Sequence, residues 1–182
     1  MLTVIALQEL YNVQGYNKEQ VQFLLNEFAC PKNLDVERFL HQKALRFEES
    51  HNARTYLILS EMSEILAYFS LSFKEVDLQV NKMSKSEIKN LDGINKNANK
   101  IRVFLIGQIG KNSLIADNPI KLADIFNEIE KILLKVKRLI GGRAVILECQ
   151  PIAKLLDLYK CHDFKKLSVV NDDEMLTLYR VL

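Results

Sequence analysis

Apolar residues recur every three or four positions in two stretches near the start of the chain, a spacing typical of amphipathic helices. In the first, Asn17 and Gln20 have the form of a capping box, and the stripe that follows consists of Val21, Leu24, Leu25 and Phe28. Pro31 is expected to end this helix. A second helix is predicted to begin near Asn33 or Asp35, with the core-facing side chains Val36, Phe39, Leu40, Ala44 and Phe47.

Three further stretches are rich in β-branched and aromatic residues, which favours strands. The sequences ARTYLIL (53–59) and EILAYFSLSF (64–73) flank the polar SEMS and are predicted to form a hairpin. IRVFLIGQIG (101–110) is predicted to be a strand with glycines at its far end. Residues 74–100 are polar and lysine-rich, and we expect a surface excursion with one short helical turn around Ser84 to Leu91. A solvated loop is the simpler interpretation of this excursion, and contact with a substrate is the alternative.

The longest regular pattern is an amphipathic helix whose stripe consists of Leu122, Ile125, Phe126, Ile129, Ile132, Leu133, Val136 and Leu139. Gly141 and Gly142 are expected to end it in a left-handed conformation. A strand over 144–149, a helix over 152–160 and a closing strand MLTLYRVL (175–182) follow. Two helices, a hairpin and then alternating strands and helices predict an α+β fold with a mixed sheet.

Composition narrows the class of protein. A chain of 182 residues is most simply one domain (1–182), and 48% apolar with 26% charged residues are ordinary globular values. The net charge of +2 does not by itself indicate a nucleic-acid or membrane partner. No apolar run reaches the roughly 20 residues of a membrane span, and the first residues lack a secretory signal. Three cysteines without CxxC spacing and three scattered histidines predict a cytoplasmic protein with reduced thiols and no bound metal.

Common catalytic motifs are missing, since no GxSxG, HExxH, Walker or GxGxxG pattern occurs. Cys149 lies in an apolar strand and is interpreted as a buried hydrophobe rather than a nucleophile. His162 is expected in a turn, and His41 and His51 on a solvated face. The unit that begins with IRVFLIGQIGKN is more informative. A glycine-interrupted strand can leave backbone groups to an extended ligand, and the N-terminus of the helix that follows can bind phosphate.

The order of these elements resembles the GNAT superfamily of acyl-CoA-dependent N-acetyltransferases over residues 33–182. LIGQIG looks like the family's splayed fourth strand, and LYKCHDF looks like its tyrosine–spacer–glycine–phenylalanine signature. The chain is similar especially to a bacterial and phage branch that includes aminoacyl-tRNA-acetylating toxins. The opening pattern of that branch is echoed by Cys30, Phe39, Leu40 and Ala44.

The resemblance implies a mixed, mostly antiparallel sheet with a splayed strand pair and flanking helices, and acetyl-CoA as co-substrate. Pantetheine would pair with Ile106, Gly107, Gln108, Ile109 and Gly110, and the pyrophosphate would lie against Lys121, Leu122 and Ala123. Tyr159 would be the general acid that protonates the CoA thiolate while an acetyl group moves to a primary amine. Packing of Tyr159 against Phe164 is the alternative interpretation. The general base stays open among Glu64, Glu75, Glu148 and a water chain.

The chain departs from the family pattern in two places. ADNPIKLADIF contains no glycine where the family has a glycine-containing pyrophosphate loop, and Pro119 removes one N–H donor. Asp163 stands where the family has glycine. A GNAT-like binding or regulatory protein with weak or no turnover is therefore the alternative function. The acceptor could be a small molecule, a protein or an aminoacyl-tRNA, and a homodimer is possible. For RNA, a basic patch could form from Lys82, Lys85, Lys89, Lys96 and Lys100.

Overall fold

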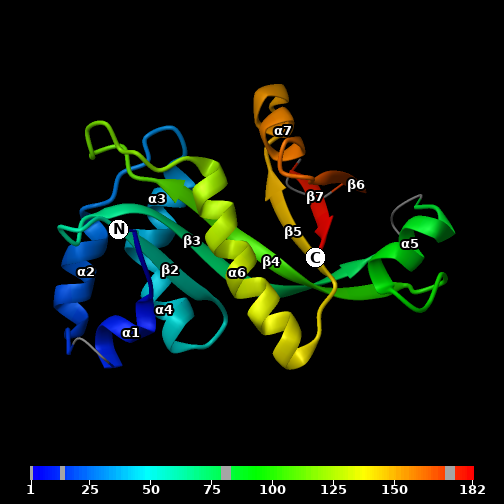
Figure 1. Ribbon diagram of the computed structural model, residues 1–182, viewed down its shortest axis with the longest axis horizontal. Coiled ribbons are helices and arrows are strands. Elements are labelled where there is room, and N and C mark those ends of the chain that lie inside the picture. The colour runs from blue at the N-terminus through cyan, green and yellow to red at the C-terminus, as the bar shows by residue number, and fades with distance from the viewer. Residues whose placement is uncertain (1, 13–14, 79–82, 171–174) are drawn as a thin grey trace. The chain divides into compact units, whose positions relative to one another are not determined.

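The computed structural model describes residues 2–12, 15–78, 83–170 and 175–182, and within them a seven-stranded sheet (Figure 1). Its strands are β1 (Thr3–Ala6), β2 (Arg54–Leu59), β3 (Ile65–Asp77), β4 (Lys100–Lys111), β5 (Ala144–Cys149), β6 (Lys165–Val170) and β7 (Leu176–Val181). The strand order is β1-β2-β3-β4-β5-β7-β6. The β4–β5 pair is parallel, whereas β1–β2, β2–β3, β5–β7 and β6–β7 are antiparallel. The predicted mixed, mostly antiparallel sheet is confirmed.

Helical segments alternate with these strands. They are α1 (Leu7–Asn12), α2 (Lys18–Asn26), α3 (Leu34–Arg38), the π-helical turn η1 (Phe39–Lys43), α4 (Ala44–Glu49), α5 (Lys85–Asp92), α6 (Leu122–Ile140) and α7 (Ala153–Lys160). The apolar pattern did not indicate β1, α1 or β6. Among the described residues, no helix combines the length and the apolar character needed to cross a membrane.

The chain divides into two compact units. Unit 1 consists of Met1–Ser72 and Gly107–Ile129, and unit 2 of Phe73–Ile106 and Glu130–Leu182. Strands β3 and β4 and helix α6 contribute residues to both units. A single domain over 1–182 stays a prediction.

In unit 1, the predicted capping box is present at the start of α2. The Asn17 side chain accepts from the Gln20 N–H at 2.9 Å, and the Gln20 side chain accepts from the Asn17 N–H at 2.9 Å. Helices α1 to α4 gather around β1 and β2 (Figure 1). They bury a shared core that includes Leu10, Leu25 and Leu57.

The second predicted helix is interrupted by the π turn η1. A π turn holds one residue more than an α turn, so the side chains that follow leave the stripe of a straight helix. Leu45 and Glu48 are buried in consequence, and Phe47 is 37% exposed. The prediction that Phe47 faces the core was therefore wrong.

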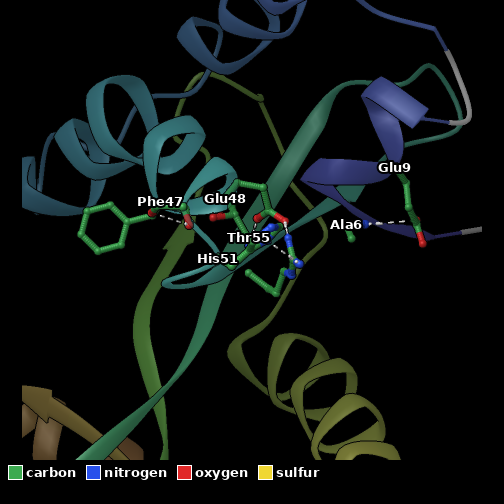
Figure 2. Close-up of polar contacts among 8 residues, drawn as sticks. Ala6, Glu9, Phe47, Glu48, His51 and Thr55 are labelled. Atoms are coloured by element: carbon green, nitrogen blue, oxygen red, sulfur yellow. Dashed lines mark hydrogen bonds and ion pairs between the residues drawn. The ribbon is translucent and has the colours of Figure 1, made fainter.

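Glu48 links the end of α4 to the start of β2, as Figure 2 shows. Its carboxylate is almost completely buried and accepts from Arg54 Nη1 at 2.5 Å and from the Thr55 N–H at 2.9 Å. His51 Nδ1 lies 3.2 Å from Arg54 Nη2, and the exposed His51 confirms its prediction. The prediction of a solvated face was wrong for His41. Its side chain is partly buried, and its Nε2 lies 2.8 Å from the Phe28 carbonyl oxygen.

In unit 2, a second core contains Val103, Ile146, Leu167 and Tyr179. Helix α5 lies beside the outer ends of β3 and β4 (Figure 1). It begins with a capping box at Ser84, so the predicted helical turn around 84–91 is confirmed. The polar excursion is shorter than predicted, because 74–77 continue β3. Residues 79–82, which include Lys82 of the basic patch, lie outside the described residues.

The amphipathic helix α6 confirms the longest sequence pattern. Ile125, Phe126, Ile129 and Leu133 are buried, whereas Leu139 near its end is 73% exposed. Beyond the helix, the backbone of both Gly141 (φ 81°) and Gly142 (φ 112°) is in the left-handed region, as the sequence predicts.

Candidate functional site

Strand β4 carries the first group of predicted site residues. Its register with β5 covers Phe104–Ile106 against Val145–Leu147, and β4 then continues to Lys111. Within the described part of the chain, residues 107–111 have no partner in β5. The edge of β4 is thus released from β5 at the segment where the family resemblance expects pantetheine.

The two glycines of this segment lie close to neighbouring side chains. A Cβ at Gly110 would lie 2.6 Å from Val36 Cγ1 and 2.8 Å from Phe28 Cζ, whereas a Cβ at Gly107 would meet Ser70 Oγ at 3.0 Å. Gly110 is buried and Gly107 exposed. Gly110 therefore serves close packing on one face of β4, while the hydrogen-bonding edge of the strand is a separate feature.

The other three predicted residues of this segment differ in how far they are buried. Ile106 is buried, and Gln108 and Ile109 are half-buried.

Asn112, directly after β4, fixes the start of the loop that leads to α6. This side chain is only 2% exposed, and its Nδ2 donates to the carbonyls of Glu27 and Ile65 at 3.0 and 2.8 Å. Its Oδ1 accepts from the Ala29 and Leu114 N–H groups, both at 3.0 Å. Two donors and two acceptor positions are the full capacity of an amide, so Asn112 is saturated.

Asn118 fixes the other end of the same loop. Its Nδ2 donates to the carbonyls of Leu66 and Asn112 at 2.8 and 3.0 Å, and its Oδ1 accepts from the Ile120 N–H at 3.1 Å. The Asn118 carbonyl accepts from the Lys111 ammonium at 2.8 Å. Side-chain amides therefore hold this loop, which contains no glycine.

Helix α6 begins at Leu122, where the sequence predicts the phosphate-binding helix start. Lys121 and Ala123 are exposed and Leu122 is half-buried. The Lys121 N–H donates to Asp124 Oδ2 at 2.8 Å, so a carboxylate of the chain itself already lies at this N-terminus.

Tyr159, near the end of α7, is half-buried and packs edge-to-face against Phe164 with 6.2 Å between ring centroids. The Arg180 guanidinium lies 5.5 Å from the Phe164 centroid. Burial, with a smaller contribution from Cys149, raises the pKa of Tyr159 to about 12. The phenol is therefore protonated at neutral pH, which a proton donor requires.

One further prediction in this region is confirmed. Cys149 is 4% exposed, and burial raises the pKa of its thiol, as expected of a small buried hydrophobe. Asp163, where the family has glycine, has φ 64°. That left-handed conformation favours glycine and is tolerated by aspartate.

The candidate bases all have partners. Glu64 accepts from Ser60 Oγ at 3.1 Å, and Glu148 pairs with Lys74 at 2.6 Å. Glu75 pairs with Lys100 at 2.8 Å, and this hydrogen bond lowers the pKa of its carboxyl, which makes it a weaker base. None of the three is identified as the base.

The predicted site residues are distributed over both units. Gly107–Gly110 and Lys121–Ala123 belong to unit 1, and Ile106 and Tyr159 to unit 2. The sequence pattern did not reveal Lys111, Asn112 or Asn118. The Asn–Pro pair at 118–119 is a turn signal that could have drawn attention to Asn118.

No protein-family model matches the chain, and no curated protein matches it. Solved structures do. AtaT complexed with acetyl-methionyl-tRNAfMet is 17% identical, with a TM-score of 0.72 over 100% of this chain and 95% of that one. A tyrosine-to-phenylalanine variant of KacT is 14% identical, with a TM-score of 0.70 over 99% and 94%.

A third structure is a tyrosine-to-phenylalanine variant of the AtaT toxin bound to acetyl-CoA and the C-terminus of the antitoxin AtaR. It is 16% identical, with a TM-score of 0.65 over 99% and 92%. Identities of this size show a shared fold, and the predicted GNAT-like α+β fold is confirmed.

Proposed function

We propose that this protein is an N-acetyltransferase that moves an acetyl group from acetyl-CoA to a primary amine. The observation that carries the proposal is the end of β4–β5 pairing at Ile106, followed by a released strand edge and a loop into α6. This arrangement occurs in a fold shared with AtaT, one structure of which is bound to acetyl-CoA. We assign the reaction to the cytoplasm, where acetyl-CoA is available.

In this proposal the backbone of 106–110 pairs with the pantetheine arm, and Lys121, Leu122 and Ala123 contact the pyrophosphate. The amine nitrogen attacks the thioester carbonyl, the C–N bond forms and the C–S bond breaks. Tyr159 donates its phenol proton to the departing thiolate, and the proton that the amine loses passes to water or a carboxylate. The ordinary pKa of a thiol is about 8.5, and protonation of the thiolate makes it a better leaving group.

An aminoacyl-tRNA is the first acceptor to test. An α-amino group has an ordinary pKa of about 8, so a substantial fraction is neutral and nucleophilic near pH 7 without a strong base. A lysine amine, with an ordinary pKa of about 10.4, depends much more on one. Each candidate base, Glu64, Glu75 and Glu148, already has a hydrogen-bond or ion-pair partner. This favours an acceptor amine that depends less on a general base. The structure of AtaT complexed with acetyl-methionyl-tRNAfMet supports the choice of this acceptor class.

A binding or regulatory protein without turnover is the second candidate function. It is favoured by the loop before α6, where Pro119 has no N–H and the Ile120 and Lys121 N–H groups bond within the chain. Residues 119–121 therefore have no backbone donor left for phosphate.

Calorimetric titration with acetyl-CoA, followed by acetyl transfer to a mixed pool of aminoacyl-tRNAs, separates the two functions. We expect saturable binding, a raised melting temperature and transfer of labelled acetyl to RNA. Binding without release of CoA to any amine would favour the second candidate. The absence of heat and of a thermal shift at millimolar acetyl-CoA would contradict the first.

A further inference from the structure

The Lys111 ammonium is held at the loop between β4 and α6. It donates to the Asn118 carbonyl at 2.8 Å, and its side chain is exposed. Among the described residues, no carboxylate forms an ion pair with it. An ammonium has three donors, so two remain for a ligand after this bond is made.

The carbonyl that holds Lys111 is itself fixed. Asn118 is tied through its amide to Leu66 and Asn112, and Asn112 is saturated in a buried position. The ammonium is therefore held by a carbonyl whose own position is fixed by the side-chain hydrogen bonds of Asn118. Pre-organisation of this kind lowers the entropic cost of binding.

At residues 119–121, directly before α6, in contrast, no backbone donor is left over. Pro119 has none, the Ile120 N–H is bonded to Asn118 Oδ1, and the Lys121 N–H is bonded to Asp124 Oδ2. The Asp124 carboxylate also adds negative charge at the helix N-terminus, which opposes an incoming phosphate. A phosphate that lies against residues 119–121 therefore depends on a cationic side chain.

We propose that Lys111 binds the pyrophosphate of acetyl-CoA and takes over part of the role that backbone N–H groups have in a glycine-rich loop. This inference rests on the proposed function and names a binding residue for it. Lysine binds phosphate as a point charge, and the hydrogen bond to the Asn118 carbonyl positions the Lys111 ammonium.

The test compares acetyl-CoA with S-acetylpantetheine, which carries the same thioester arm but no phosphate. Lys111→Met should weaken acetyl-CoA binding about ten- to hundredfold, the size of one charge-assisted hydrogen bond. Its affinity for S-acetylpantetheine should stay within about twofold of the wild type, and Lys111→Arg should recover part of the loss. Lys43→Met, which removes an exposed lysine elsewhere in unit 1, is the matched control and should leave both affinities unchanged.

Salt dependence gives a second readout. The affinity of the wild type for acetyl-CoA should fall with salt more steeply than that of Lys111→Met, because one ion contact is absent in the variant. Unchanged acetyl-CoA affinity in Lys111→Met would overturn the role of Lys111 and leave the proposed function intact. Equal losses for both ligands would also overturn it, since the lysine would then only support the loop. If the wild type binds neither ligand, the proposed function itself fails.

Discussion

At the scale of single residues, Asn112 is the side chain on which the loop beside the candidate site depends most. Its partners lie 47 to 85 residues away, at Ile65, Ala29 and Glu27. No local sequence pattern could have revealed them, because the hydrogen bonds exist only once distant segments meet. Conversely, the capping box at Asn17 was predictable, since its two partners are three residues apart.

Asn112→Asp should destabilise the protein by about 2–4 kcal/mol. Aspartate keeps an acceptor for Ala29 and Leu114 but places an oxygen against the Glu27 and Ile65 carbonyls, so two buried donors become a repulsive contact. Denaturant unfolding at pH 7 measures the change. Asn99→Asp at an exposed position is the control, and a loss no greater than in that control would show that the Asn112 amide does not hold the loop.

Tyr159→Phe should lower the rate of acetyl transfer about a hundred- to ten-thousandfold and leave acetyl-CoA affinity almost intact. The ring is kept, so its packing against Phe164 should survive. Steady-state kinetics with parallel calorimetry measure both quantities, and the exposed Tyr16→Phe is the control. Normal turnover in Tyr159→Phe would remove the phenol from the mechanism and leave it a packing residue.

The pKa of Tyr159 predicts how stability depends on alkaline pH. The folded-state pKa of Tyr159, about 12, lies above the ordinary value of 10. The neutral phenol therefore contributes to the free energy of unfolding in full below pH 10, and this contribution is lost as pH rises towards 12. Wild type should therefore lose about 2 kcal/mol relative to Tyr159→Phe between pH 9 and about 11.5. Urea unfolding of both proteins at the two pH values measures the difference. An unchanged difference would place Tyr159 in a solvated environment.

At the scale of elements, β4 shows why the role of its glycines could be predicted only in part from the sequence. The sequence suggested glycines that leave backbone to a ligand, whereas Gly110 is required by the side chains of Val36, Phe28 and Tyr68. Local spacing can place a glycine in a strand but cannot say which distant side chain approaches it.

Gly110→Ala should cost about 1–3 kcal/mol, because the added methyl group meets three side-chain atoms at 2.6 to 2.9 Å in a packed core. Gly107→Ala is the matched control in the same strand, since its one close neighbour is the hydroxyl of Ser70 at 3.0 Å. Thermal unfolding of the two variants provides the comparison. Equal stability of both would mean that the α3 segment can move away from β4.

Elements with a clear apolar pattern were predictable, whereas β1, α1 and β6, which lack one, were not. The stripe of α6 repeats over five turns, so its period stands out, whereas β1 has four residues and runs directly into α1. β6 begins with two lysines, which is unlike a strand by composition. The π turn η1 has no sequence signal, and it alone displaced Phe47 from the predicted core face.

At the scale of the whole molecule, the α+β class with a mixed sheet followed from the alternation of helices and strands, but the strand order and the division into two units did not. No linker interrupts the sequence, and β3, β4 and α6 each pass from one unit to the other. An element of this kind cannot melt in one unit without leaving its backbone unpaired in the other. We therefore expect both units to unfold together, as the prediction of one domain requires.

Ile146→Ala tests that expectation. Ile146 is 1% exposed in the core of unit 2, and its truncation should cost about 2–5 kcal/mol. If the chain is one cooperative domain, native-state hydrogen exchange should report the same loss of free energy at amides of β2 in unit 1 and of β7 in unit 2. The mirror variant Leu57→Ala in the core of unit 1 should give the same result with the units exchanged. A loss confined to the mutated unit in both variants would show two independent domains, since a shared strand would then fail to couple them.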